Sequence, residues 1–413
     1  MISELIYKVN AFEDISHALS LINSEKSPQK MPSLGELQKK FGEFLPLALE
    51  QYKLKEKAIK KLPSFVSVGC LFEQRSLEQS TSESVALWKA GFFSSHKMLS
   101  LSGGLGIDDW AWLKLGCTVK SLDPNGALNQ LVEFNFNKTL PTEQLNKYKR
   151  LTFTAEEYLS AHGIEPSIDL IYVDPDRRQE NERLGGNFSI FQPNIIELIE
   201  KYGNLCNRWL IKLSPATDFR EIRKWLPGEL HFYSVMYKSE VKELLVEVHP
   251  LGDQNILRSA VNIKESEHAD IFHEVDDLAQ IGKKSDGLDF IFEPHGHLNV
   301  LGLNEKFREH PDLVSVTTQG TLFVGKCTFP NYLGRTLRVE LEFNGSLKEL
   351  KRTLKDQNIA QATVTARDCG GMKGHELLKI LGIKDGGNRV IFITKSGSEF
   401  RAWVGGYLFT LDK

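Results

Sequence analysis

Two carboxylates, a proline and two guanidinium groups directly follow an apolar run of strand length. The segment Ile168–Arg178 reads Ile-Asp-Leu-Ile-Tyr-Val-Asp-Pro-Asp-Arg-Arg. A continuous Ile/Leu/Val run is typical of a strand that is buried on both faces of a parallel sheet. Charged residues just past the carboxyl end of such a strand lie where open α/β sheets bind ligands. The segment therefore marks a candidate binding edge, although a solvated turn that merely ends a core strand has the same composition.

A second group of candidate residues lies upstream, in the glycine-rich sequence Ser102–Gly106. It separates a predicted strand, Met98–Leu101, from a predicted helix, Ile107–Lys114. Glycines in such a turn let backbone amides approach a ligand closely, and the N-terminus of a helix favours polar or anionic groups. Asp123 ends the next predicted strand, where a carboxylate can accept hydrogen bonds from both hydroxyls of a ribose. Together these residues predict a cofactor that contains a nucleoside.

The first turn of that helix helps to distinguish between two cofactors. A dinucleotide site usually has the pattern Gly-x-Gly-x-x-Gly, whereas Gly104-x-Gly106 is followed by Ile-Asp-Asp and no third glycine appears. Asp108 and Asp109 would repel a pyrophosphate in a desolvated site. The same two acids suit a cofactor with a sulfonium and an ammonium group. The sequence therefore favours S-adenosylmethionine over NAD.

The elements that must position these residues alternate between strands and helices. The predicted strands are Met98–Leu101, Cys117–Leu122, Leu151–Thr154, Ile168–Val173 and Trp209–Leu213, and the predicted helices are Ile107–Lys114, Leu128–Asn137 and Ile195–Tyr202. This alternation predicts a largely parallel sheet with right-handed crossovers. Residues 231–236 and 244–248 predict a final antiparallel pair of strands.

The flanking regions follow other patterns. Residues 1–62 are predicted to be helical, and Ser80-Thr-Ser-Glu83 fits a capping box at the start of a further helix. Residues 250–290 are polar and acidic, which predicts a linker or a peripheral segment. Residues 337–409 combine predicted strands with two helices, as in a small α+β unit.

Several of these motifs, in this order, resemble those of class I S-adenosylmethionine-dependent methyltransferases. The matching motifs are Ser100–Asp108, Asp123-Pro-Asn125, Asp169–Arg178 and Ile211–Pro215. More narrowly, the chain resembles a bacterial family with a helical N-terminal region and a C-terminal THUMP-like domain. The motifs that carry this narrower resemblance are Glu78–Glu83 with Ala86 and Lys89-Ala90, Lys242–Leu245, Phe292-Glu-Pro294 and Asp385-Gly-Gly387.

The resemblance implies an α/β fold with a Rossmann-like, seven-stranded methyltransferase sheet. The implied domains are a helical N-terminal region (1–90), the methyltransferase domain (91–250), a linker with a small ferredoxin-like α+β segment (251–335) and a THUMP-like α+β domain (336–413).

The resemblance also implies roles for single residues. The implied cofactor-binding residues are Ser102, Gly103, Gly104, Gly106, Asp108, Asp123 and Glu156. The implied catalytic residues are Asp174 and Pro175, and the implied substrate-binding residues are Asp176, Arg177, Arg178, Lys212, Ser214 and Pro215. Methyl transfer is an in-line displacement, so the protein mainly aligns the nucleophile and accommodates the vanishing sulfonium charge.

Two residues depart from the pattern of the family. Ser100 stands where the glycine motif usually opens with an acid, and Thr154 stands where an acid near the adenine is common. Asp108 and Glu156 are the candidate substitutes. Because of these two departures, the sequence also allows a weakened or non-catalytic relative of the methyltransferases.

Two further assignments have alternatives. Arg177 and Arg178 suit bidentate contacts with a phosphate, but equally an ion pair with Asp176 or other nearby acids. Ser214-Pro215 either lines an acceptor pocket or simply ends a strand.

Other classes of site are not expected. The five cysteines are scattered and form no Cys-x-x-Cys pair, which argues against a disulfide framework or a structural zinc and favours a reducing compartment. His295-Gly-His297 lacks acids at metal spacing, so we expect no metal. The first residues lack the pattern of a signal peptide, and no run approaches the roughly 18–20 apolar residues of a membrane span. We therefore expect a soluble, cytoplasmic protein without a membrane partner, and the oligomeric state stays open.

The predicted function is methyl transfer from S-adenosylmethionine to RNA, either tRNA or rRNA, because a THUMP-like domain suggests RNA by resemblance. Lys+Arg 51 against Asp+Glu 54 gives a net charge of −3, which adds no independent support for a nucleic-acid partner. The alternatives are methylation of a small molecule or a protein, or a non-catalytic RNA-binding relative with a decayed cofactor site.

Overall fold

The computed structural model describes residues 38, 42, 45–177, 191–264, 268–284 and 289–407. The chain divides into two compact units. The first unit comprises Met1–His231, Leu244–Ile256 and Ile263–Ala269, and the second comprises Phe232–Glu243, Leu257–Asn262 and Asp270–Lys413.

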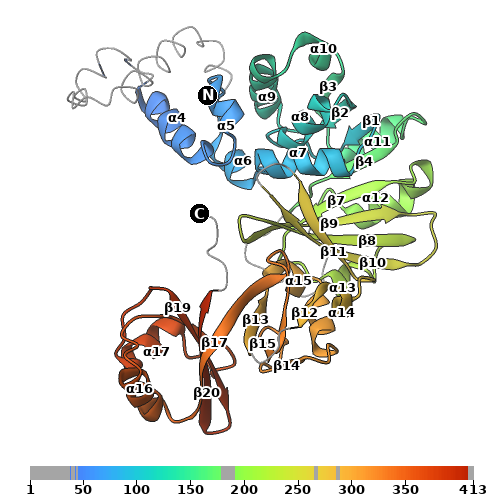
Figure 1. The fold of residues 1–413 in the computed structure, drawn as a ribbon. Helices are drawn as coiled ribbons and strands as arrows, with labels where there is room; N and C mark the ends of the chain where they lie inside the picture. The colour runs from blue at the N-terminus through green and yellow to red at the C-terminus, as the bar shows by residue number, and fades with distance from the viewer. Residues whose placement is uncertain are drawn as a thin grey trace. The chain divides into compact units, whose positions relative to one another are not determined.

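The central strands of the large sheet alternate with helices along the chain (Figure 1). The strands are β1 (Lys97–Ser100), β2 (Thr118–Leu122), β3 (Tyr148–Leu151), β4 (Leu170–Val173), β7 (Trp209–Leu213), β8 (Glu229–Tyr237), β9 (Glu240–His249), β10 (Ile256–Ile263) and β11 (Ala269–His273). The intervening helices are α8 (Ile107–Lys114), α9 (Gly126–Thr139), α10 (Thr142–Leu145), α11 (Ala155–His162), α12 (Ile195–Tyr202), η3 (Gly203–Leu205) and α13 (Phe219–Ile222).

The strand order is β11-β10-β8-β9-β7-β4-β1-β2-β3. Strand β1 pairs in parallel with both β2 and β4, and the β2–β3 and β4–β7 pairs are also parallel. Strand β9 pairs with β7 in the antiparallel direction. The order of the parallel strands reverses between β1 and β4, and ligands of open α/β sheets bind past the carboxyl ends of the strands at such a reversal. The predicted Rossmann-like arrangement is therefore present, but the sheet has nine strands rather than seven, because β10 and β11 extend it where the sequence suggested a linker.

Burial on both faces explains why β4 has a continuous apolar sequence. Leu170, Ile171 and Val173 are each 0% exposed. Pro175 follows two residues after the strand, and the chain then forms the short strand β5 (Asp176–Arg177), which pairs in antiparallel fashion with β6 (Phe191–Gln192). The ladder of the large sheet thus stops where the carboxylates begin.

The first unit also contains four described helices that precede β1. They are α4 (Leu45–Ala58), α5 (Pro63–Ser67), α6 (Gln74–Gln79) and α7 (Glu83–Phe92). The predicted capping box at Ser80 is wrong, because Ser82 is the N-cap of α7 and the Ser80 hydroxyl donates to the carbonyl of Leu77. Glu83 instead accepts from the backbone N–H and the hydroxyl of Ser64 in α5. A contact between helices has replaced the local cap.

The third strand lies earlier than predicted. It spans Tyr148–Leu151 rather than 151–154, and the Thr154 hydroxyl accepts from the N–H of Glu157 in a capping box at the start of α11. Thr154 therefore acts as a helix cap, which the apolar-run criterion did not detect.

The second unit contains a seven-stranded sheet of order β14-β15-β13-β17-β20-β19-β18. Its strands are β13 (Phe290–Pro294), β14 (Leu313–Ser315), β15 (Phe323–Gly325), β17 (Gly334–Gly345), β18 (Thr363–Ala366), β19 (Arg389–Ser396) and β20 (Glu399–Tyr407). The remaining elements are α14 (Leu278–Ile281), β12 (Lys283–Lys284), α15 (Gly296–Val300), η4 (Leu303–Arg308), β16 (Cys327–Thr328), α16 (Leu347–Asp356) and α17 (Gly374–Leu381). Leu350 and Leu354 of α16 and Leu377 of α17 share a buried cluster with Ile391 of β19. The predicted α+β elements of residues 337–409 are thus present as far as residue 407.

Candidate functional site

The three glycines of the loop between β1 and α8 differ in what a side chain would meet. A Cβ atom on Gly103 would lie 2.4 Å from Ser121 Oγ and 2.7 Å from an Arg150 nitrogen, and one on Gly106 would lie 2.9 Å from Val132 Cγ1. Gly104 has a φ of +51°, and a Cβ there would meet no atom within 4 Å. A side chain at Gly103 or Gly106 would therefore collide with neighbouring residues, whereas the space beside the Cα atom of Gly104 is open.

Arg150, in β3, holds this loop through a hydrogen bond to its backbone. Its side chain is 6% exposed. The guanidinium group donates to the carbonyl of Gly104 (2.6 Å), to Asn129 Oδ1 (2.6 Å) and to the Tyr148 hydroxyl (3.2 Å). Its NH1 nitrogen also lies 3.8 Å from Asp109 Oδ2. Burial raises the pKa of Asp109 to about 6, against the opposing effect of Arg150. The glycine loop is thus held by a buried cation.

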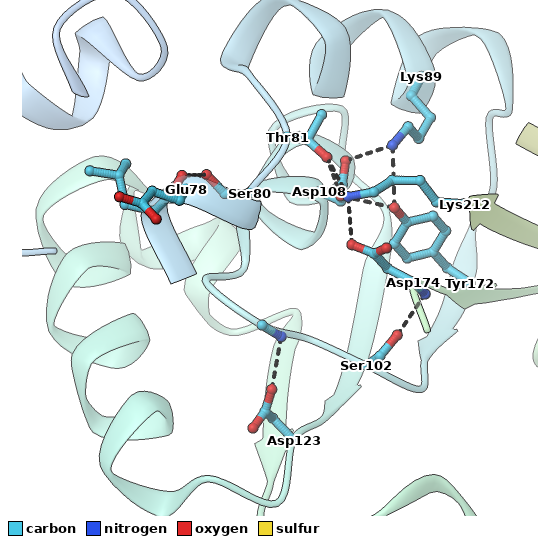
Figure 2. A network of polar contacts seen from close by, with 12 residues as sticks. Glu78, Ser80, Thr81, Lys89, Ser102, Asp108, Asp123, Tyr172, Asp174 and Lys212 are labelled. Atoms are coloured by element: carbon cyan, nitrogen blue, oxygen red, sulfur yellow. Dashed lines mark hydrogen bonds and ion pairs between the residues drawn. The ribbon is translucent and has the colours of Figure 1, made fainter. Parts of the chain in front are cut away.

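Asp123 lies at the carboxyl end of β2, opposite the same loop (Figure 2). Its Oδ2 accepts from the N–H of Gly104 (2.9 Å), and its Oδ1 accepts from the N–H of Asn125 (2.9 Å). Its Oδ2 also lies 3.6 Å from the Nη2 atom of Arg150. A carboxylate oxygen has two lone pairs, and Oδ1 accepts only the one backbone hydrogen bond named above, so it can accept another. The side chain is 13% exposed. The open space beside the Cα atom of Gly104 therefore adjoins a carboxylate that is partly exposed.

A buried ion pair lies on the other side of the loop. The Lys89 ammonium group of α7 is 0% exposed and lies 3.0 Å from Asp108 Oδ1. Asp108 Oδ2 accepts from the hydroxyls of Thr81 and Tyr172, both at 2.9 Å. Burial opposes ionisation of Asp108, but Lys89 and Lys212 outweigh it and lower the pKa of Asp108 to about 2. Asp108 is therefore an ionised and internally compensated carboxylate.

This compensation changes the electrostatic argument drawn from the sequence. Asp108 is paired with Lys89, and Asp109 lies beside Arg150. The two acids therefore offer little uncompensated negative charge to a cofactor, and the case against a pyrophosphate loses most of its force. A direct contact between Asp108 and the cofactor stays a prediction.

Asp174, which follows the last residue of β4, contacts the same network through Lys212. The Lys212 ammonium group of β7 lies 2.5 Å from Asp174 Oδ2, and Figure 2 shows it between the carboxylates of Asp174 and Asp108. The backbone N–H of Asp174 donates to Ser102 Oγ (2.6 Å), which ties it to the glycine loop. Burial raises the pKa of Asp174, with Lys212 opposing the shift. The side chain is still 35% exposed, so it can reach a ligand. Pro175 is buried.

The other predicted site residues are less closely connected to this network. Asp176 is exposed and forms an ion pair with Arg75 of α6 (2.8 Å). Only the backbone of Arg177 is described, as part of β5, and Arg178 lies outside the described residues.

Three further candidates lie on other elements. Glu156, in the first turn of α11, accepts from the backbone N–H of Asn194 (3.3 Å). Ser214 is exposed, and its hydroxyl accepts from the N–H of Ala216 (3.3 Å) in the turn after β7, where the neighbouring Pro215 is partly buried. This geometry agrees with the interpretation that Ser214-Pro215 simply ends a strand. A role of the two residues in substrate binding stays a prediction.

Four residues of the network were not singled out from the sequence as site residues: Thr81, Lys89, Arg150 and Tyr172. Lys89 carries a detectable signal, because it follows Val85 and Ala86 at spacings of four and three on the face of α7 that is buried. A lysine on an apolar face requires a partner. Arg150 was missed because the third strand was placed too late.

Metal and membrane features were searched in the parts of the chain listed above as described. There, no group of three or more His, Cys, Asp or Glu side chains could hold a metal ion. His297 is 0% exposed, and burial lowers its pKa to about 3. Across the same ranges, no helix is both long and apolar enough to cross a bilayer.

Comparisons with known proteins address the fold and the C-terminal region. Residues 334–405 match the family model described as THUMP domain-like. The chain shares its fold with a protein from Porphyromonas gingivalis W83 whose crystal structure is described as a "putative methyltransferase". The two are 22% identical over 96% of this chain and 98% of that chain, with a TM-score of 0.74.

A "predicted O-methyltransferase" from Agrobacterium tumefaciens aligns over 42% of this chain and 85% of its own, with 12% identity and a TM-score of 0.31. No curated protein matches the sequence. The Porphyromonas gingivalis structure and the family match confirm the predicted α/β fold and the C-terminal THUMP-like unit.

Proposed function

We propose that this protein is an S-adenosylmethionine-dependent methyltransferase that acts on RNA. One observation carries the proposal: Gly104 with Asp123, and Asp174 with Ser102, lie at one edge of the sheet where the strand order reverses. The first pair suits a nucleoside and the second presents a carboxylate beside it. The "putative methyltransferase" with the same fold supports this assignment.

The residues proposed to hold the cofactor are Ser102, Gly103, Gly104, Gly106, Asp108, Asp123 and Glu156. When bound, the cofactor supplies an electrophilic methyl group on a positively charged sulfur. The backbone at Gly104 would contact its methionine part, and Asp123 would accept hydrogen bonds from its ribose. Most of the catalytic task is to align an acceptor atom. We assign this task to Asp174, whose partly exposed carboxylate can accept a hydrogen bond from the acceptor, and to the rigid, buried Pro175.

The RNA part of the proposal rests on the second unit. The THUMP-like match lies there, and α16 has exposed cations at Lys348, Lys351, Arg352 and Lys355. The helix also has the acids Glu349 and Asp356, of which Asp356 pairs with Arg352, so its four cations leave a local excess of positive charge on a chain whose net charge is −3. Asp176, Arg177, Arg178, Lys212, Ser214 and Pro215 are the residues proposed to be near the acceptor.

Mass spectrometry of nucleosides from total RNA of a deletion strain tests the substrate class. We expect one methylated nucleoside to disappear and to return when the wild-type gene is restored, but not when an Asp174→Ala variant is restored. An unchanged nucleoside profile together with measurable cofactor binding would point instead to a small-molecule or protein substrate. An absence of cofactor binding would point to a non-catalytic relative.

A further inference from the structure

Lys212 was expected to bind substrate, and the geometry points to a different task. We propose that Lys212 is a positioning residue whose ammonium group orients the Asp174 carboxylate and keeps it ready to accept a proton from an acceptor N–H group. This inference deepens the proposed methyltransferase function and rests on it. It also argues against an anionic oxygen as the acceptor, and a neutral nitrogen that carries a hydrogen is the acceptor that we propose.

The contacts of Lys212 are the first observation. Its Nζ lies 2.5 Å from Asp174 Oδ2, donates to Thr81 Oγ1 at 3.0 Å and lies 3.9 Å from Asp108 Oδ2. The side chain is only 12% exposed. An ammonium group surrounded in this way is oriented toward protein partners. A lysine that captures a substrate phosphate would need its donors directed to solvent.

The second observation explains why Lys212 pairs with Asp174 rather than with Asp108. Asp108 already has the Lys89 ammonium group at 3.0 Å and the hydroxyls of Thr81 and Tyr172. Lys89 also lies 3.2 Å from the Tyr172 hydroxyl. Because the charge of Asp108 is already compensated, Lys212 makes its shorter contact with Asp174, and Asp108 attracts the ammonium group only from a longer distance.

The charged groups that face Asp174 come from three elements. Lys212 of β7 and Lys89 of α7 favour its ionised form, and Asp108 of α8 opposes it, as does burial. Removing the Lys212 ammonium group would therefore raise the pKa of Asp174 further and favour the neutral acid. An ionised carboxylate accepts hydrogen bonds only, so it can bind an N–H group but repels an anionic oxygen.

The chemical step balances with these groups. The acceptor nitrogen uses its lone pair to form a bond to the methyl carbon, and the carbon–sulfur bond breaks with its electron pair remaining on sulfur. The nitrogen then keeps the electrons of its N–H bond while the proton moves to an Asp174 carboxylate oxygen. Asp174 is 35% exposed, so the neutral acid can pass this proton to water and regain its charge.

A direct titration of Asp174 tests the role of Lys212 without substrate or cofactor. The aspartate side-chain carboxyls are labelled with carbon-13, and the Asp174 signal is identified by its absence in Asp174→Asn. In Lys212→Met we expect the Asp174 midpoint to rise by about 1–3 pH units, the usual effect of one nearby opposite charge. Lys212→Arg keeps the cation and should keep the midpoint close to wild type. The matched control is Lys120→Met, which removes a partly buried lysine of β2 that pairs with Glu165. This variant should leave the Asp174 midpoint unchanged.

Two further measurements separate this inference from the proposed function. With RNA from the deletion strain as acceptor, the acid limb of the methyl-transfer rate should move to higher pH in Lys212→Met, while calorimetry shows cofactor affinity close to wild type. An unchanged Asp174 midpoint in Lys212→Met would overturn the inference even if the enzyme is a methyltransferase. A wild-type protein that does not bind S-adenosylmethionine would overturn the proposed function, whereas the titration would still report on Lys212.

Discussion

At the scale of single residues, the site depends on which atoms are already committed to the protein. Asp108 uses both oxygens for Lys89, Thr81 and Tyr172. Asp123 accepts one backbone N–H on each oxygen, lies 3.6 Å from Arg150 and adjoins the open space beside the Cα atom of Gly104. The two carboxylates look equivalent in the sequence, but Asp108 pairs with a fully buried lysine, whereas Asp123 adjoins open space.

The different tasks of Asp123 and Asp174 lead to a first prediction. Asp123→Ala should weaken the affinity for S-adenosylmethionine roughly ten- to hundredfold for each ribose hydrogen bond that is lost, because hydrogen bonds to a charged group contribute about 1.5–3 kcal/mol each. Asp174→Ala should retain the affinity and lose turnover. Isothermal titration calorimetry of both variants measures the difference. An equal loss of affinity in the two variants would contradict the division of roles, and Asp169→Asn at the opposite end of β4 is the control.

The glycine loop gives a second prediction. Gly104→Ala and Gly106→Ala both place a side chain at positive φ, which costs about 1–3 kcal/mol in either case. Only at Gly106 would the new methyl group also collide with Val132, and overpacking typically adds about 1–3 kcal/mol. Denaturant unfolding should therefore show Gly106→Ala as the less stable variant. Cofactor titration should show Gly104→Ala as the weaker binder relative to its stability. If Gly106→Ala instead weakened cofactor binding more than Gly104→Ala did, relative to stability, the ligand would not lie beside Gly104.

At the scale of elements, the parallel core was the part most accessible to prediction. The strand at Trp209–Leu213 and the helices at Ile107–Lys114 and Ile195–Tyr202 have the bounds expected from their apolar patterns. These elements are specified by local periodicity. The start of α7 and the position of β3 were wrong, because Glu83 is used by a contact with α5 and Thr154 by a helix cap. Contacts between distant segments leave no local pattern to detect.

The same limit explains how much of the site could be predicted. The glycine loop, Asp123 and Asp174 follow strands and helices in recognisable positions. Lys89 and Arg150 act across elements, and their partners Asp108 and Asp109 are known only from the folded chain. The sequence therefore indicated the ligand-facing carboxylates and Lys212, but not Lys89 and Arg150 as partners of Asp108 and Asp109.

The ion pair that joins α7 to α8 gives a third prediction. Lys89→Met should lower the free energy of unfolding by about 3–5 kcal/mol, because removing one partner of a buried ion pair leaves the other charge buried and uncompensated. The pKa of Asp108 is about 2 in the folded protein and about 3.9 when unfolded. Its stabilisation is therefore complete above the unfolded value and is lost as the pH falls from about 4 to about 2. Unfolding measured across this range should show a steeper acid loss in wild type than in Asp108→Asn. Parallel pH curves would contradict the assignment.

At the scale of the whole molecule, the two units have different proposed tasks. The first contains the residues proposed to bind the cofactor, and the second contains residues 334–405 of the THUMP-like match and the cations of α16. The near-neutral net charge of the chain hides this local arrangement. Composition alone could therefore not show where RNA would bind.

The cations of α16 give a fourth prediction. Replacing Lys348, Lys351 and Lys355 with glutamine should weaken RNA binding and reduce the slope of log affinity against log salt by about 2, because fewer counterions are released. Replacing the exposed Lys53, Lys57 and Lys60 of α4 and the turn after it is the matched comparison. An equal effect of the α4 set would show that α16 is not the specific contact.

The central claim is that this chain moves a methyl group from S-adenosylmethionine to RNA. The most direct test supplies the purified full-length protein with cofactor labelled in the methyl group and with total RNA from the deletion strain. We predict that label enters one nucleoside with the wild-type protein and none with Asp174→Ala. The account is contradicted if the wild-type protein binds the cofactor and the RNA yet leaves the RNA without label.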